Sequence, residues 1–168
     1  LRVRRLPTQD DIEIGKGEVV QDFTAARGHK VTFLALGNMQ PIAKKAAEQL
    51  TAEGFNCAII NPRFTKPIDE ELTERFASVS EVVVTLEDHV LMGGYGSAVL
   101  EHLSEKRIHT PVVRIGWPDK FIEHASTVDY LRQKHGLTAE NAVAKVKAQF
   151  NAAPVTPASS EQPKPKLA

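Results

Sequence analysis

Side chains that can do chemistry gather in two short stretches of the sequence. Glu87, Asp88 and His89 come directly after the apolar run VVVTL, and a glycine-rich stretch, GGYGS, follows at residues 93–97. Carboxylate and imidazole groups suit proton transfer or a divalent metal. Glycines ahead of a helix can let backbone N–H groups hold a phosphate. These two stretches therefore form the first candidate site.

The glycine stretch does not have the spacing of a phosphate-binding motif. Neither G-x-G-x-x-G nor G-x-x-x-x-G-K-[ST] fits it, and the glycines follow a loop rather than a strand. We therefore expect a loop scaffold in which Gly94 needs either a positive φ or a close approach of backbone. Phosphate binding is the alternative. The residues of the expected scaffold are Glu87, His89, Gly93, Gly94, Gly96 and Ser97.

Two further kinds of site can be assembled from the polar loops. The candidate metal ligands are Glu87, Asp88, His89, Asp119 and His124. They are single ligands on two loops without an H-E-x-x-H or D-x-D pattern, which makes a metal site a weak prediction. Ser97, His89 and Asp119 could make a catalytic triad, but GYGSA around the serine is not the G-x-S-x-G turn of hydrolases, and we reject it.

The pattern of apolar residues predicts strands that alternate with helices. Strands are expected at 18–21, 31–36, 57–60, 82–86 and 112–115, and helices at 39–53, after Asp69, after the glycine stretch and from 139 onward. Asn38, Asp69 and Ser126 are expected to cap helices. Such alternation predicts an α/β fold of three layers, an open, mostly parallel sheet of about five strands with helices on both faces.

The loops at the carboxyl ends of the strands are the expected ligand loops of such a sheet. They are residues 37–38, 61–69, 87–96 and 116–126, and they contain the candidate residues above. Arg63, in the second loop, could hold a carboxylate or phosphate in a bidentate fork. An ion pair with an acid on a neighbouring element is an equal alternative.

Composition predicts one soluble, cytoplasmic α/β domain at residues 12–150. The chain has 168 residues, 21 Lys and Arg against 21 Asp and Glu, and a single cysteine, Cys57. This balance predicts no nucleic-acid partner, the sequence contains no apolar stretch that predicts a membrane span, and one cysteine excludes an internal disulfide. We expect residues 1–11 to be a connector from missing upstream domains and 151–168 to be a disordered Pro/Ala/Lys tail.

Four blocks of sequence, in order, resemble one family. IGKGEVV at 14–20, NPRFTKPIDEEL at 61–72, VVVTLEDHVLMGGYGSAV at 82–99 and IGWPDKFIEHAS at 115–126 are similar to the C-terminal domain of 1-deoxy-D-xylulose-5-phosphate synthases, within the transketolase C-terminal-domain family. More distantly they resemble the same domain of transketolases and of 2-oxo-acid dehydrogenase beta subunits. The resemblance covers residues 12–150.

The resemblance implies one section of a transferase that uses thiamine diphosphate and Mg²⁺. That family joins pyruvate to glyceraldehyde 3-phosphate with loss of CO₂, in isoprenoid biosynthesis, and holds the cofactor between a diphosphate-binding and a pyrimidine-binding domain of a homodimer. This sequence has no G-D-G followed by a downstream Asn that would hold the diphosphate and metal. The chain alone is therefore expected to bind no cofactor, to supply no catalytic residue and to be inactive.

The role that the resemblance implies is structural. We expect the chain to pack against the missing domains and to stabilise the dimer, with interdomain contacts from Arg63, Asp119 and His124. The alternatives are a free-standing module that binds a nucleotide or sugar phosphate, and the equivalent domain of a transketolase or 2-oxo-acid dehydrogenase beta subunit.

Overall fold

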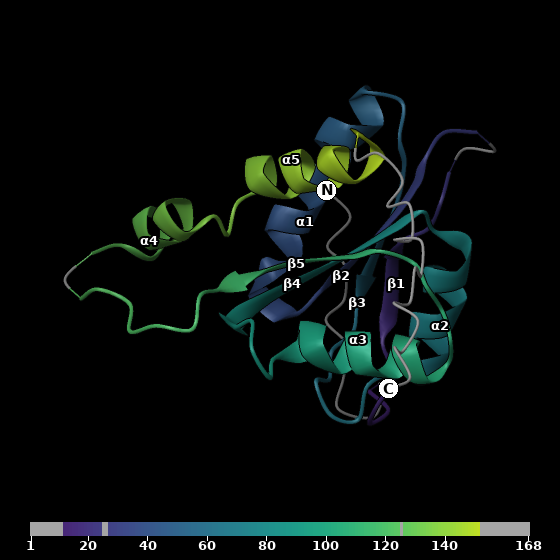
Figure 1. The fold of residues 1–168 in the computed structure, drawn as a ribbon, viewed down its shortest axis with the longest axis horizontal. Helices are drawn as coiled ribbons and strands as arrows, with labels where there is room; N and C mark the ends of the chain where they lie inside the picture. The colour runs from purple at the N-terminus through teal and green to yellow at the C-terminus, as the bar shows by residue number, and fades with distance from the viewer. Residues whose placement is uncertain (1–11, 25–26, 125, 152–168) are drawn as a thin grey trace, which may run out of the picture.

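The computed structural model of the chain describes residues 12–24, 27–124 and 126–151. Its strands are β1 (Glu18–Gln21), β2 (Lys30–Ala35), β3 (Asn56–Asn61), β4 (Val82–Val90) and β5 (Val112–Trp117). Its α-helices are α1 (Gln40–Ala52), α2 (Glu70–Val79), α3 (Tyr95–Glu105), α4 (Val128–His135) and α5 (Ala139–Asn151), and a short 3-10 helix, η2 (Gly37–Met39), precedes α1. Figure 1 shows how they are arranged.

The five strands form one sheet in the order β1-β3-β2-β4-β5. Strands β3, β2, β4 and β5 are parallel, and β1 pairs antiparallel with β3 at one edge. The predicted open, mostly parallel α/β sheet is therefore confirmed. From β2 the chain first adds β3 on one side and then β4 and β5 on the other, so the switch point of the topology lies between β2 and β4.

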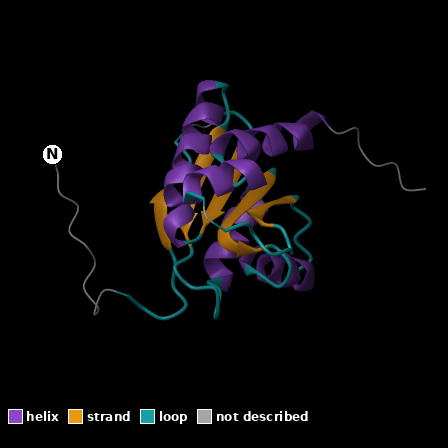
Figure 2. Cartoon of the chain, turned by 90° about the vertical axis from the view of Figure 1, so that its left-hand side faces the viewer, coloured by secondary structure: helices purple, strands orange, loops and turns teal. Residues whose placement is uncertain are grey.

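Helices cover both faces of the sheet and enclose two hydrophobic cores. Helices α1 and α5 lie on one face, and α2 and α3 lie on the other (Figures 1 and 2). Strand β4 sends Val82, Val84 and Leu86 into the first core and Val83 into the second. This confirms the expectation that both faces of the strand are buried, as in the middle of a covered parallel sheet.

Strand β4 is longer than the sequence predicts. It continues past residue 86 to Val90, so Glu87, Asp88 and His89 are strand residues rather than the start of a loop. The reason is long-range pairing, because β4 and β5 pair again at Val90 and Trp117 after an irregularity that follows Leu86. A bulge of this kind redirects side chains near the end of a strand.

Two of the expected helix caps are wrong. Asn38 lies inside η2 and donates its side-chain N–H to Asp88, so it caps no helix. Helix α4 is capped by Thr127, whose hydroxyl accepts from the backbone N–H of Tyr130, and not by Ser126. The Asp69 cap of α2 is confirmed, with its carboxylate accepting from the N–H of Leu72 at 3.0 Å.

The ends of the chain lie mostly outside the described residues. This applies to the whole predicted connector at 1–11 and to residues 152–168 of the predicted tail, whereas Asn151 is the last residue of α5. None of the described helices combines the length and apolar character that crossing a bilayer requires.

Candidate functional site

Glu87 closes the N-terminus of helix α3. Its side chain is fully buried, and its two carboxylate oxygens accept from the backbone N–H of Tyr95 at 2.6 Å and of Gly96 at 2.9 Å. These N–H groups have no partner within the helix and carry the positive end of its dipole, which favours an anion. The anion-binding end of α3 is therefore occupied by a carboxylate of the same chain.

The glycines beside this carboxylate are required by close packing. A Cβ on Gly94 would collide with the Glu87 carboxylate and with the carbonyl of Val90, and one on Gly96 would lie 2.5 Å from Thr85 Oγ1. Gly94 has φ −83°, so close approach and not a positive φ explains this glycine. Gly93, at φ 69°, is the position with left-handed backbone. Gly96 lies within α3 rather than in the preceding turn. We call Glu87, Gly94, Tyr95 and Gly96 the α3 cap.

Ser97 ties the glycine turn to strand β5. Its hydroxyl donates to the carbonyl of Leu91 at 2.9 Å and accepts from Arg114 Nη1 at 3.0 Å and from the N–H of Gly93 at 3.2 Å. All three partners belong to the turn or to its neighbouring strand. The serine therefore holds the turn in place, as expected for a scaffold residue.

A crevice lies at the switch point between β2 and β4. It has a volume of about 560 Å³ and is lined by residues 36–38, Thr65, residues 87–89 and residues 93–95. His89 lies exposed on its rim, with Nδ1 3.0 Å from the carbonyl of Val90. The crevice has the position expected of a ligand site in this fold. The helix N-terminus that would bind a phosphate there is already closed by Glu87.

Asp88 joins three segments of the chain at the end of β4. Its carboxylate accepts from Asn38 Nδ2 at 2.7 Å, from Trp117 Nε1 at 2.6 Å and from Arg132 Nη2 at 2.6 Å. Partial burial acts to raise the pKa of Asp88, but the hydrogen bonds from Trp117, Asn38 and Arg132 outweigh it and lower the pKa below 3.8. Sequence reasoning offered Asp88 only as a metal ligand, because its three donors are distant in sequence.

Asp119 and His124 lie on an extension that we call the arm, which consists of the described residues 118–124 and 126–135, a loop followed by α4. It leaves the carboxyl end of β5 and reaches away from the body of the domain (Figure 1). Asp119 and His124 are both exposed. No residue of α4 is buried. The arm also exposes Phe121 completely, with 104% of its reference surface accessible.

A polar network within the arm joins its loop to α4. The Glu123 carboxylate accepts from Lys134 Nζ at 2.7 Å and lies 3.1 Å from His135 Nε2. The hydrogen bond from Lys134, with those from the Glu123 backbone and His135, lowers the pKa of Glu123 to about 2. Trp117 packs edge-on against His135, with ring centroids 5.6 Å apart, at the base of the arm. The arm is therefore an ordered element.

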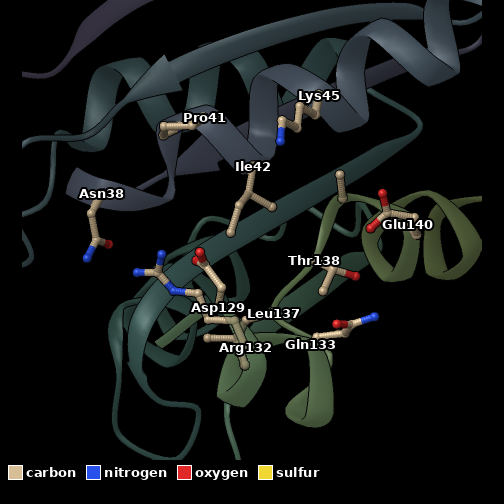
Figure 3. A pocket seen from close by; sticks show the side chains of 11 residues that line it. Asn38, Pro41, Ile42, Lys45, Asp129, Arg132, Gln133, Leu137, Thr138 and Glu140 are labelled. Atoms are coloured by element: carbon tan, nitrogen blue, oxygen red, sulfur yellow. The ribbon is translucent and has the colours of Figure 1, made fainter. Parts of the chain in front are cut away.

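A second hollow, of about 550 Å³, separates the arm from the body of the domain. It is lined by the start of α1, by α4 and by the start of α5, and Figure 3 shows Arg132 reaching across it toward Asn38. Its charged side chains are of both signs, Lys45 and Arg132 against Asp129 and Glu140. This hollow therefore has no charge preference for an anionic or a cationic ligand.

The candidate metal ligands that the sequence offered do not come together among the described residues. The group of metal-ligand atoms that comes together there is instead Glu70, Glu74 and His102, whose ligand atoms lie within 4.8 Å of one another. The ammonium of Lys106 lies beside both carboxylates, 3.0 Å from Glu74 and 3.9 Å from Glu70. Its hydrogen bond lowers the pKa of Glu74, so the group is an ion network between α2 and α3.

Arg63 forms an ion pair within the domain. Its guanidinium lies 3.1 Å from the carboxylate of Glu18 on β1, which is the ion-pair alternative rather than a fork for a ligand. The interdomain role of Arg63 stays a prediction. Cys57 is buried in β3, and burial raises the pKa of its thiol to about 11, so the thiol is poorly suited to act as a nucleophile.

Comparison with known proteins identifies the family of the chain. The family described as the transketolase C-terminal domain matches residues 18–142. The chain is 47% identical over 135 residues to the 1-deoxy-D-xylulose-5-phosphate synthase of Acidobacterium capsulatum, covering 80% of the chain and 21% of that protein. The same-named protein of Methylacidiphilum infernorum is 47% identical over 132 residues, covering 79% of the chain and 20% of that protein.

A solved structure agrees with these matches. A chain described as split gene transketolase, inactive beta4 tetramer, superposes with a TM-score of 0.74 at 39% identity, covering 89% of this chain and 47% of that one. The present chain spans about a fifth of the length of the synthases that it matches. From the family match, the relatives and the sheet topology, the chain belongs to the transketolase C-terminal-domain family.

Proposed function

We propose that the chain is the C-terminal section of a 1-deoxy-D-xylulose-5-phosphate synthase and that its role there is structural. The whole enzyme would join pyruvate to glyceraldehyde 3-phosphate with release of CO₂. The observation that carries the proposal is the α3 cap, together with the identity of about 47% to such synthases. At the place where this fold usually binds a ligand, the chain has filled the anion site with its own Glu87.

The described residues do not fit thiamine diphosphate and Mg²⁺. The α3 N-terminus cannot accept a diphosphate while Glu87 occupies it, and the Glu70, Glu74 and His102 group already holds the Lys106 ammonium. We infer that upstream diphosphate-binding and pyrimidine-binding sections hold the cofactor. The chain alone then supplies no catalytic group and is inactive. The split-gene transketolase that it resembles is described as an inactive beta4 tetramer.

We further propose that the chain acts in the cytoplasm, within a homodimer of the complete enzyme. In this role it contributes packing surface rather than chemistry, so the domain must be stable and its loops must be held in fixed positions. The Glu87 and Ser97 hydrogen bonds supply that rigidity at the ends of β4 and β5. Arg63, Asp119 and His124 are the interdomain contacts that we propose.

A free-standing binding module is the second candidate, and the switch-point crevice is the observation in its favour. A calorimetric titration of the isolated chain with ADP, pyrophosphate and triose phosphates distinguishes the two. Our proposal expects no binding tighter than about 100 μM, which corresponds to roughly 5.5 kcal/mol. Tighter binding of any of these ligands would favour the module.

The direct test is reconstitution. The upstream sections from the same genome are expressed with and without this chain, and formation of 1-deoxy-D-xylulose 5-phosphate is measured. We expect activity only when both parts are present. Full activity of the upstream sections alone, or turnover by this chain alone, would contradict the proposal. A Val79→Ser variant, altered at an exposed position of α2, is the matched control and should reconstitute normally.

A further inference from the structure

The exposed apolar side chains of the domain are unevenly distributed. Of the nine large apolar side chains exposed among the described residues, six lie on or next to the loops at the carboxyl edge of the sheet. Those six are Ile12, Ile14, Met92, Phe121, Val128 and Tyr130. The other three are Val20, Val79 and Leu100, one each on β1, α2 and α3. Ile12 and Ile14 precede β1 at one end of the sheet, whereas Met92, Phe121, Val128 and Tyr130 lie at the end formed by β4 and β5. A group of exposed apolar side chains such as these four marks an interaction surface.

The arm carries the largest part of this surface. Phe121 is fully exposed, and Val128 and Tyr130 are 57% and 55% exposed on α4. Met92 lies near the base of the arm, because the N–H of the preceding Leu91 donates to the carbonyl of Trp117 at 2.9 Å. Aromatic side chains of this kind supply most of the binding energy at protein interfaces.

The arm is held in position before any partner binds. Arg132 fixes α4 to Asp88 on β4, and Glu123 joins the loop to Lys134 and His135. The arm is joined to the body by these polar contacts and by the packing of Trp117 against His135, and none of the residues of α4 is buried, so Phe121, Val128 and Tyr130 stay free for another surface. Preorganisation of this kind reduces the entropy that association costs.

We propose that the arm, with Met92 beside its base, is the surface on which the upstream section of the same enzyme docks. The inference rests on the proposed function. The length of the relatives supports this choice of partner, because the chain spans only about a fifth of them. In a complete enzyme of that length, the rest of the protein would contact this domain on one of its faces. Helices already cover both faces of the sheet, and the carboxyl edge is where apolar groups stay exposed.

The test compares binding of two matched variants to the upstream section. The probe is the upstream section from the same genome, purified as one polypeptide and titrated by calorimetry with this chain. The arm variant is Phe121→Ser with Val128→Ser. The control is Val79→Ser, which removes an apolar side chain of similar exposure at the opposite, amino edge of the sheet. Thermal melts of the free variants confirm that they are folded.

We expect the arm variant to bind at least tenfold more weakly than wild type and the control to bind within twofold of it. Equal binding by the arm variant would overturn the inference while leaving the proposed function intact. No binding by the wild-type chain would overturn the proposed function itself. If the substitutions in the arm instead abolish self-association of the isolated chain, the occupant is a second copy and the inference is wrong.

Discussion

The α3 cap and the arm lie at the same edge of the sheet but differ in whether the groups that could bind another molecule already have partners within the chain. In the cap, the backbone N–H groups of Tyr95 and Gly96 find their acceptor within the chain, since Glu87 occupies the helix N-terminus, and a side chain on Gly94 or Gly96 would collide with its neighbours. In the arm, Arg132 and Glu123 form ion pairs, but Phe121, Val128 and Tyr130 are exposed. The cap is complete without a partner, and the arm is not.

This difference teaches how a domain can keep the architecture of a ligand-binding fold and serve another purpose. The switch point and the glycine turn are both present, and sequence motifs alone would allow a phosphate site there. A single buried carboxylate changes the outcome, because it supplies the anion internally. We propose the arm as the surface through which this edge contacts another section of the enzyme.

Replacement of Glu87 should have the largest effect on stability. Glu87→Ala leaves the N–H groups of Tyr95 and Gly96 buried without an acceptor and opens a cavity, which we expect to lower the free energy of unfolding by about 2–5 kcal/mol. Chemical denaturation of the isolated chain measures this loss. Glu87→Gln, which keeps one acceptor oxygen, should lose less. A wild-type unfolding curve for Glu87→Ala would show that the cap contributes nothing.

Gly94→Ala should have the next largest effect. The added Cβ would meet the Glu87 carboxylate and the Val90 carbonyl, so we expect a loss of about 1–3 kcal/mol and a melting temperature lower by several degrees. Gly93→Asn is the control, because asparagine tolerates φ 69° and nothing lies within 4 Å of a Cβ there. Coincident melts of wild type and Gly94→Ala without ligand would refute the scaffold interpretation.

Asp88→Ala should loosen the arm with a smaller loss of global stability, about 1 kcal/mol. The chain has one tryptophan, Trp117, and its indole N–H donates to Asp88, so its fluorescence reports directly on the base of the arm. We expect a shifted emission maximum at 25 °C while the far-ultraviolet circular dichroism stays unchanged. Unaltered emission would mean that Asp88 does not hold this junction.

The same junction should respond to acid. The folded-state pKa of Asp88 is lowered, so the stability that this group contributes is complete above pH 3.8 and is lost as pH falls through the lower folded-state value. Tryptophan emission is therefore expected to change as the pH falls below about 4. Asp88→Asn is the control and should lack this transition. The same transition in Asp88→Asn, or its absence in the wild type, would contradict the assignment.

Phe121→Ser should leave the isolated domain as stable as the wild type, within about 0.5 kcal/mol. The side chain is fully exposed and buries no surface on folding, so its loss costs little. Chemical denaturation checks this. A loss above about 1 kcal/mol would show that Phe121 packs within the domain, and the contrast between the cap and the arm would then fail.

The layers of the fold could be predicted from the sequence, because β-branched runs indicate strands and the helical spacing of apolar residues indicates helices. Both patterns lie within short stretches of the chain. The pattern VVVTL identified a strand buried on both faces, but it could not show that the strand continues through Glu87 to Val90. That extension depends on pairing with Trp117, which lies far along the chain. The residues that neighbour β4 in the sequence do not reveal this pairing partner.

The candidate site was predictable only where one segment supplies all of its parts. Glu87 and the glycines lie within ten residues, so their contact with one another could be expected from that stretch alone. The role of Asp88 needed Asn38, Trp117 and Arg132, which come from three separate segments. Phe121 gave only a weak signal in the sequence, as an aromatic residue in the polar loop PDKFIEH.

Hydrogen exchange followed by mass spectrometry, on the free chain and on its complex with the upstream section, tests the central contrast most directly. We expect the first amides of α3, Tyr95 and Gly96, to be protected in both states, because Glu87 is their acceptor throughout. Residues 118–135 should gain protection only in the complex. Rapid exchange at the start of α3 in the free chain, or an arm that exchanges equally fast in the complex, would contradict the account.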